Sequence, residues 1–185
     1  MHRLPDIMDT ERLRLRRAKP SDAEALFSLF NNWVVVKWLA RPSWPNEIAR
    51  THAYLEQVNQ SPLGEHYWAI ERAGGLVGGI SAGIQPASAH QSAEGPHIGY
   101  WLGERFWGQG VMTCAASLLC EAIFACTEEP AIYSGVFLGN EGSLRIQHKL
   151  GFRVEGRDEL FSTPLGRPMP HVSTRLLRND FRPVA

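Results

Sequence analysis

The stretch Arg105-Phe-Trp-Gly-Gln-Gly-Val-Met-Thr113 is the most informative part of this chain. It joins an apolar segment at 96–102, which is typical of a strand, to a segment at 110–126 that favours a helix. The two glycines let the backbone turn sharply and bring bare N–H groups close to a ligand. The helix that follows adds unpaired N–H groups and a partial positive charge at its start. A strand, a Gly-x-Gly turn and a helix in this order therefore predict a site for a phosphate or pyrophosphate.

Two familiar phosphate loops do not fit this stretch. A Walker loop needs Gly-Lys-Ser/Thr, and here Gly110 is followed by Val-Met. A dinucleotide fingerprint needs a third Gly or Ala at the position that holds Thr113. The pattern Arg-x-x-Gly-x-Gly (Arg105, Gly108, Gly110), and the longer string from Gly99 onward, resemble the acyl-CoA pyrophosphate loop of the GNAT superfamily of N-acetyltransferases. Within it, the string is most similar to the ribosomal-protein N-terminal acetyltransferase-like branch.

Composition and charge limit the possible partners. The chain has 185 residues, of which 44% are hydrophobic and 21% charged, as in ordinary soluble domains. The formal net charge is zero, so no global field attracts nucleic acid or an anionic membrane. The basic run Arg12–Arg17 alternates with leucines and is interpreted as the solvated side of a strand. We therefore expect no nucleic-acid partner.

The sequence also indicates a reducing compartment. No stretch is apolar enough to span a membrane, and the start of the chain lacks a signal-peptide core. Cys114, Cys120 and Cys126 recur every six residues, which places them on different faces of one predicted helix. This pattern favours buried free thiols over disulfides or a zinc site. We expect a cytoplasmic protein without a membrane partner.

The order of elements predicts one mixed α/β (α+β) domain over residues 1–185. Strands are predicted at 11–17, 67–72, 76–84, 96–102, 131–138, 152–161 and 171–177. Helices are predicted after a capping box at Ser21–Glu24, within 33–45, from Asn46 to about 59, at 110–126 and at 140–150, with Gly151 as the last cap. This order is similar to the GNAT fold. The resemblance implies a mostly antiparallel, twisted sheet of about seven strands flanked by helices, whose fourth and fifth strands splay into a V.

The resemblance implies acetyl-CoA as the co-substrate, bound by the glycine loop and the V. The motif begins at Arg105, and main-chain N–H groups of the residues after it would surround the pyrophosphate. These residues are Phe106, Trp107, Gly108, Gln109, Gly110 and Val111. Thr113 would add a hydroxyl, Leu102 would pair its backbone with the pantetheine arm, and Asn140 would contact the same arm. The seven histidines show no metal-ligand spacing, so no metal is expected.

Acetyl transfer also needs a group that stabilises the departing thiolate. Many members of the family place a Tyr just before the segment 149–152, but here that position holds Gln147, whose amide cannot act as an acid. The branch resembled here offers a serine instead, which corresponds to Ser143. Its hydroxyl would hydrogen-bond the sulfur or relay a proton near a helix start, where the dipole favours a thiolate. The alternative is that Asn140 and Ser143 are plain helix caps.

The general base is predicted in the strand before the loop. Relatives often have Glu-Ile-Gly-Tyr there, and this chain has His97-Ile-Gly-Tyr100. Imidazole titrates near neutrality, so His97 would take a proton from an ammonium directly or through water. Glu94 and Glu104 are weaker candidates, and simple packing of His97 is the alternative. Cys114, where many relatives have Glu, is interpreted as a packing residue.

Aromatic residues surround the expected acceptor pocket. Trp33, Trp38 and Trp44 lie in the region that borders this pocket in relatives, and Tyr100 and Trp101 lie on the neighbouring strand. They would form a wall for a peptide N-terminus or a flat amine. Core packing is the alternative and would account for at least half of them.

The resulting hypothesis is an acetyl-CoA-dependent N-acetyltransferase with direct attack in a ternary complex. Its acceptor would be a primary amine, on a protein N-terminus or a small molecule. One alternative is a non-catalytic acyl-CoA-binding or sensing module, since the usual Tyr and Glu are missing. Another is a transferase for a longer acyl group. The sequence is compatible with a monomer or a homodimer.

Overall fold

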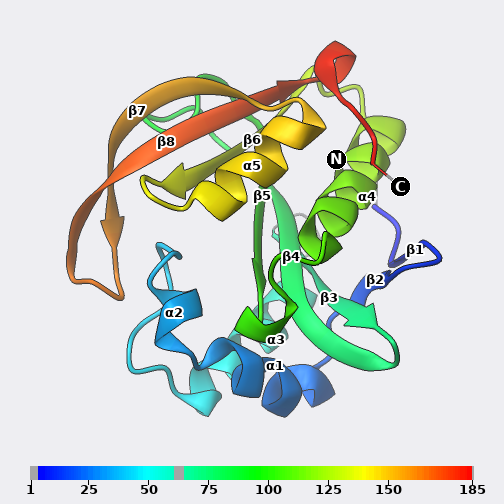
Figure 1. The fold of residues 1–185 in the computed structure, drawn as a ribbon, viewed down its shortest axis with the longest axis vertical. Helices are drawn as coiled ribbons and strands as arrows, with labels where there is room; N and C mark the ends of the chain where they lie inside the picture. Colours follow the sequence, from blue (N-terminus) through cyan, green and yellow to red (C-terminus); the bar gives the residue numbers. More distant parts are fainter. Residues whose placement is uncertain (1–3, 61–64, 185) are drawn as a thin grey trace.

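A single sheet of eight strands organises the chain (Figure 1). The computed structural model describes residues 4–60 and 65–184. The strands are β1 (Ile7–Asp9), β2 (Arg14–Arg17), β3 (His66–Arg72), β4 (Gly75–Gln85), β5 (Gly95–Leu102), β6 (Ala131–Phe137), β7 (Arg153–Ser162) and β8 (Arg167–Leu177). Their order in the sheet is β1-β2-β3-β4-β5-β6-β8-β7, and only the pair β5–β6 is parallel. The prediction of a mixed, mostly antiparallel architecture is confirmed, with one strand more than expected.

The helices cover both faces of this sheet. They are α1 (Ala23–Phe30), α2 (Trp33–Val36), α3 (Ile48–Gln60), α4 (Val111–Cys126) and α5 (Glu141–Leu150), with short 3-10 turns at η1 (Pro20–Asp22), η2 (Glu104–Phe106) and η3 (Arg178–Asp180). The larger core lies beneath α4, where Cys114 and Cys120 are buried free thiols, as predicted, and Cys126 is half-buried. A smaller core lies beneath α1 and α3. None of the helices in the described part of the chain combines the length and apolar character that a membrane crossing requires.

Strand β3 shows why the sequence forms a two-faced sheet. Alternate residues Trp68 and Ile70 pack into the core beneath α4, while Tyr67 and Ala69 pack beneath α1 and α3. All four are buried, as expected for a central strand covered on both sides.

The N-terminal region differs from the sequence prediction. Of the strand expected at 11–17, only residues 14–17 form one, β2, and the additional strand β1 precedes it at 7–9. Thr10 turns the chain between them, because its N–H donates to the Leu13 carbonyl at 2.9 Å. The capping box at 21–24 is also wrong. Helix α1 starts at Ala23, and the carboxylate of Asp22 accepts instead from the Lys19 main chain at 2.7 Å. The local pattern favoured a box, but Asp22 has a tertiary partner.

That partner is Arg16, which was wrongly predicted to lie on a solvated strand face. Its guanidinium makes two hydrogen bonds to Asp22, at 2.7 and 2.8 Å, and a third to Glu71 at 2.7 Å. Only 17% of the Arg16 side chain is exposed. Arg16 therefore ties β2 to β3 and to the start of the first helix.

The parallel pair β5–β6 opens into the expected V. A single register pair, His97 with Tyr133, joins the two strands. Next to it, the Ser134 hydroxyl donates to the Ile98 carbonyl at 3.0 Å. Strand β6 instead continues along β8 for its whole length, so the two halves of the sheet diverge beyond residue 98. In Figure 1, β7 and β8 arch away from β2–β5.

Candidate active site

The glycine loop runs from the end of β5, through η2, to the start of α4. Gly108 and Gly110 have φ angles of +72° and +75°, the left-handed region that favours glycine. A Cβ added at Gly108 would meet no atom within 4 Å, and at Gly110 only the Arg12 guanidinium at 3.4 Å. The main chain is therefore bare on the side where a ligand would approach.

The main-chain N–H groups of the loop and of the first turn of α4 lack main-chain partners within the described residues. The first hydrogen bond of α4 runs from the Cys114 N–H to the Gly110 carbonyl at 3.1 Å. Within residues 4–60 and 65–184, no main-chain acceptor is found for the preceding N–H groups, 108–113. Six donors beside the positive end of a 16-residue helix fit a diphosphate.

Two of the main-chain N–H groups predicted to bind the pyrophosphate already have acceptors within the protein. The N–H groups of Phe106 and Trp107 donate to the carbonyls of Gly103 and Glu104, both at 3.0 Å. They close the turn η2 and face inward, because a 3-10 turn uses its own donors. The predicted donors that remain are Gly108, Gln109, Gly110 and Val111.

Three arginines surround the loop, two of which sequence reasoning missed. Arg12 donates to the Gln109 carbonyl at 3.4 Å, and Arg72 donates to the Gln109 side chain at 2.6 Å. The Arg105 guanidinium lies 4.7 Å from the centre of the Phe106 ring. Arg12 and Arg72 come from the β1–β2 turn and the end of β3, so only the sheet pairing brings them here. No local pattern in the sequence signals this proximity.

Leu102 ends β5 beside the loop. Its side chain is buried, and its carbonyl accepts a hydrogen bond from the indole N–H of Trp107 at 2.9 Å. This bond holds the Trp107 ring, which is 41% exposed, near the end of β5, where the V is open. Val111 and Thr113 are buried in the first turn of α4, so the Thr113 side chain lies inside the protein.

Across the V, β5 and the start of α5 come together. Asn140 is the N-cap of α5, and its side-chain oxygen accepts from the Ser143 N–H at 3.2 Å. The Tyr100 and Ser143 hydroxyls are 2.9 Å apart and share a hydrogen bond. Burial raises the pKa of Tyr100 to about 12, so the phenol stays protonated. The structure thus brings Tyr100, Asn140 and Ser143 together.

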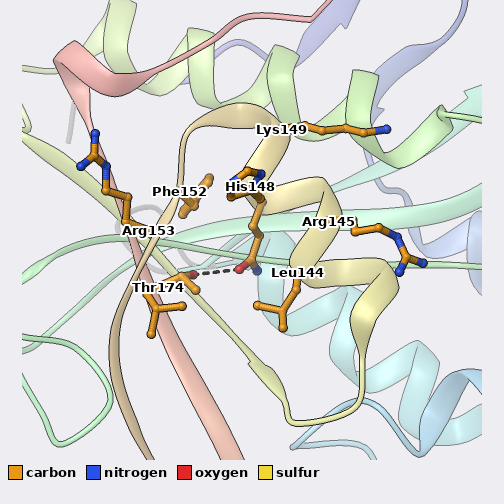
Figure 2. A pocket seen from close by; sticks show the side chains of 9 residues that line it. Leu144, Arg145, His148, Lys149, Phe152, Arg153 and Thr174 are labelled. Carbon is orange, nitrogen blue, oxygen red and sulfur yellow. Dashed lines mark hydrogen bonds between the residues drawn. The ribbon is translucent and has the colours of Figure 1, made fainter.

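Gln147 fills the place of the usual tyrosine with a structural contact. It is 2% exposed, and its amide N–H donates to the Ser134 hydroxyl at 3.0 Å. Its carbonyl accepts from the labelled Thr174 at 2.9 Å, the bond that is dashed in Figure 2. With the Ser134 bond to Ile98, this network joins β8, α5, β6 and β5 where the V opens. Gln147 therefore holds the two halves of the sheet.

His97 lies on the opposite face of β5 from Tyr100, since the two are an odd number of residues apart. It is half-buried. Burial, and to a smaller extent the positive charge of Arg41, lowers the pKa of His97 to about 4. The structure therefore does not place His97 beside the hydroxyl pair of Tyr100 and Ser143.

The predicted aromatic wall divides into two groups. The ring centres of Trp33 and Trp44 lie 5.4 Å apart with the rings tilted by 50°, and both side chains are more than a third exposed. Trp38 approaches Gly139, just before α5, where an added Cβ would lie 3.5 Å from its ring. Trp101 instead packs against Phe30 in the smaller core. Because neighbouring strand residues face opposite ways, Tyr100 and Trp101 cannot line one wall.

A depression of about 570 Å³ lies elsewhere, between α5 and β7 (Figure 2). Its lining includes Leu144, His148, Phe152 and Val154, and none of the lining residues is a sequence-predicted site residue. It contains no residue of the glycine loop and none of β5. We therefore assign the candidate active site to the V and the loop.

Comparisons with known proteins agree with this geometry. Residues 12–153 match the family model of the acetyltransferase (GNAT) domain. An uncharacterized N-acetyltransferase, YoaA of Bacillus subtilis (strain 168), is 31% identical over 157 residues, which cover 81% of this chain and 84% of that protein. The crystal structure of a putative acetyltransferase from T. thermophilus superimposes with a TM-score of 0.78 at 26% identity, covering 97% of this chain and 93% of that one.

A solved structure of RimL, a ribosomal L7/L12 alpha-N-protein acetyltransferase, in complex with coenzyme A shares the fold. Its TM-score is 0.78 at 20% identity, over 92% of this chain and 97% of that one. The family model covers most of the chain, and YoaA is more than 30% identical over more than two thirds of both proteins. The chain therefore belongs to the GNAT acetyltransferase family and is an N-acetyltransferase.

Proposed function

We propose that this protein transfers the acetyl group of acetyl-CoA to a primary amine, which attacks the thioester directly in a ternary complex. The observation that carries the proposal is the row of bare N–H groups at 108–113, beside the V between β5 and β6. Residues 1–185 would act as one catalytic domain in the cytoplasm, as a monomer or homodimer. Acetyl-CoA, when bound, supplies the acyl group and a thiolate leaving group.

The loop and the V would hold the co-substrate. The diphosphate would accept from the N–H groups of 108–113, with Arg12, Arg72 and Arg105 balancing its charge. The main chain of Leu102 would pair with the pantetheine arm, and the Asn140 amide would contact the same arm. The RimL complex with coenzyme A, which has the same fold, supports this placement.

Ser143 and Tyr100 would stabilise the departing sulfur. The raised pKa of Tyr100 keeps its proton in place, so the phenol can donate to the Ser143 hydroxyl. The Ser143 proton is then free to point at the sulfur. The start of α5 adds a partial positive charge that favours the thiolate.

His97 would act as the base from the face of β5 opposite Tyr100, at the position where β5 still pairs with β6. Its lowered pKa keeps the imidazole neutral at physiological pH but also makes it a weak base, so it would take the proton only as the amine attacks and its nitrogen becomes more acidic. The neighbouring Arg41 disfavours an ammonium and so favours the neutral amine that must attack. The acceptor would approach between α2 and the hairpin of β7 and β8, past Trp33 and Trp38.

The acceptor is proposed to be a primary amine of a peptide N-terminus or a small molecule. RimL, named for the α-amino group of a ribosomal protein, supports a peptide. The exposed pair of Trp33 and Trp44 would suit a flat or extended acceptor equally well.

One observation favours a second function, an acyl-CoA sensor without catalysis. Gln147 occupies the position of the usual acid and is committed to structural hydrogen bonds. One experiment distinguishes the two functions. Acetyl-CoA is mixed with each member of a panel of amines and N-terminal peptides, and the release of free thiol is measured. An enzyme releases thiol with at least one acceptor. A sensor shows a higher melting temperature with acetyl-CoA but no thiol release with any acceptor.

A further inference from the structure

A cluster of two histidines and one carboxylate lies outside the site described above. His90 comes from the β4–β5 loop, Asp158 from β7 and His171 from β8. The His90 Nδ1 lies 2.8 Å from one Asp158 oxygen, and the His171 Nδ1 lies 2.9 Å from the other. One ligand atom from each residue lies within 4.8 Å of the others. None of the three has a role in the proposed acetyl transfer.

The chemistry of this cluster suits a transition-metal ion. Two imidazole nitrogens and a carboxylate oxygen are a common set of protein ligands for Zn²⁺. With bonds of about 2.0–2.1 Å, tetrahedral ligand atoms lie about 3.4 Å apart. The separations in the cluster, from 2.8 Å to no more than 4.8 Å, bracket that distance. Small side-chain movements would therefore complete the geometry.

The two strand ligands are held rigidly. Asp158 and His171 are directly paired across the β7–β8 ladder, so their side chains share one face. His171 is 7% exposed, and its Nε2 lies against Gly135, where an added Cβ would be only 2.3 Å away. With Nε2 packed inward, Nδ1 is the nitrogen that faces Asp158.

The loop ligand is also positioned. The Gln91 side chain folds back to donate to the carbonyls of Gln85 and Ala93, at 3.0 and 2.7 Å, which shapes the loop around His90. The Ser92 hydroxyl and Glu155 make a second bond from the loop to β7. The His90 side chain is 34% exposed, which leaves room for water as a fourth ligand.

The charge of the cluster matches a divalent cation. Of its three members Asp158 is the acidic one, and its carboxylate would supply one negative charge to the cation. A site of this kind stabilises the fold by binding the folded state alone.

We propose that His90, Asp158 and His171 form a binding site for a divalent transition-metal ion of the zinc class. The bound ion would link the β4–β5 loop to the hairpin of β7 and β8. The sequence alone predicts no metal, because these ligands lie 68 and 13 residues apart and follow no local spacing. The sheet alone brings them together. The proposal is independent of acetyl transfer.

The test uses tag-free full-length protein, treated with chelator and then titrated with ZnCl₂ by calorimetry and by melting temperature. We expect one Zn²⁺ per chain and a higher melting temperature. His90→Ala and Asp158→Asn should each weaken zinc affinity by at least about tenfold. His52→Ala, a change in an exposed histidine on α3, is the matched control and should bind like the unchanged protein.

The contrary result is equally clear. If the unchanged protein binds no zinc at micromolar concentrations, or if His90→Ala binds as tightly as His52→Ala, the cluster is only a hydrogen-bonded tie and the proposal is wrong. Should Asp158→Asn fail to fold by circular dichroism, His90→Ala decides alone, because its side chain lies on a surface loop.

Discussion

The hydroxyl pair of Tyr100 and Ser143 is the most specific contact in the candidate active site. If Ser143 stabilises the leaving thiolate, Ser143→Ala should lower kcat by about 10²-fold with little change in the KM for acetyl-CoA. Tyr100→Phe should have a smaller effect, since it removes only the partner of Ser143. Steady-state kinetics with a verified acceptor measure both. Ser28→Ala, on the outside of α1, is the control; unchanged turnover in Ser143→Ala would exclude the role.

His97 carries a prediction about pH. Because its pKa is lowered to about 4, the imidazole is neutral throughout the range of about pH 6 to 9, and its own inflection lies on the acid side of that range. The ratio of the rates of the unchanged protein and His97→Gln should therefore be large and constant across this range. A full rate in His97→Gln would show that His97 is not the base.

Residue-scale predictions from the sequence succeeded where the signal was local. The two glycines have the positive φ angles that their pattern predicted, and Asn140 caps α5. Arg12 and Arg72 were missed because their place beside Gln109 depends on strand pairing over long distances in sequence. Trp101 was assigned to the acceptor wall because composition does not tell which face of a strand is covered.

At the scale of elements, the start of α4 works together with the β1–β2 turn and the end of β3. Arg12→Ala and Arg72→Ala should each raise the KM for acetyl-CoA about tenfold and leave kcat nearly unchanged, since charge-assisted hydrogen bonds contribute about 1.5–3 kcal/mol. The effect should shrink at high salt. Arg167→Ala, at the exposed start of β8, is the control. Equal KM values in all three variants would contradict the assignment.

The ion pair between β2 and η1 predicts how stability depends on pH. Burial alone would raise the pKa of Asp22, but the Arg16 and Lys19 hydrogen bonds outweigh it and lower the pKa. Since the folded pKa is the lower one, the stabilisation is present above the unfolded pKa of about 3.9 and is lost as pH falls through the folded value. Asp22→Asn should cost about 2 kcal/mol at pH 7 by urea unfolding.

Urea unfolding of Asp22→Asn and of the unchanged protein below about pH 4 checks the sign of this effect. The difference between their free energies of unfolding should shrink there. Asp9→Asn breaks the exposed pair with Arg14 and should change stability little. A cost for Asp22→Asn that is the same at acid and neutral pH would show that the lost interaction is not ionic.

Most elements were predicted from periodicity, and each error has its own physical cause. The boundaries of α4, α5 and β6 agree with the sequence to within a residue. Strand β1 is only three residues long and shows too little alternation to be recognised. The capping box failed because Asp22 has a tertiary partner, and such partners override local propensity.

At the scale of the whole molecule, the V between β5 and β6 is what makes the sheet a binding site. It exists because β6 pairs along its length with β8 and meets β5 at one register position. The buried Gln147 network fixes that point. The resemblance to the family predicted the V, whereas periodicity could not, since register between distant strands leaves no periodic trace in sequence.

The central claim is that the main chain at 108–113 holds the diphosphate of acetyl-CoA, and calorimetric titration of Gly108→Val with acetyl-CoA tests it most directly. Gly166→Val is the matched control, because both glycines have positive φ and open space around them, but Gly166 lies in the distant β7–β8 turn. The account predicts that Gly108→Val weakens acetyl-CoA binding at least about tenfold while Gly166→Val binds normally. Unchanged binding in Gly108→Val would contradict it.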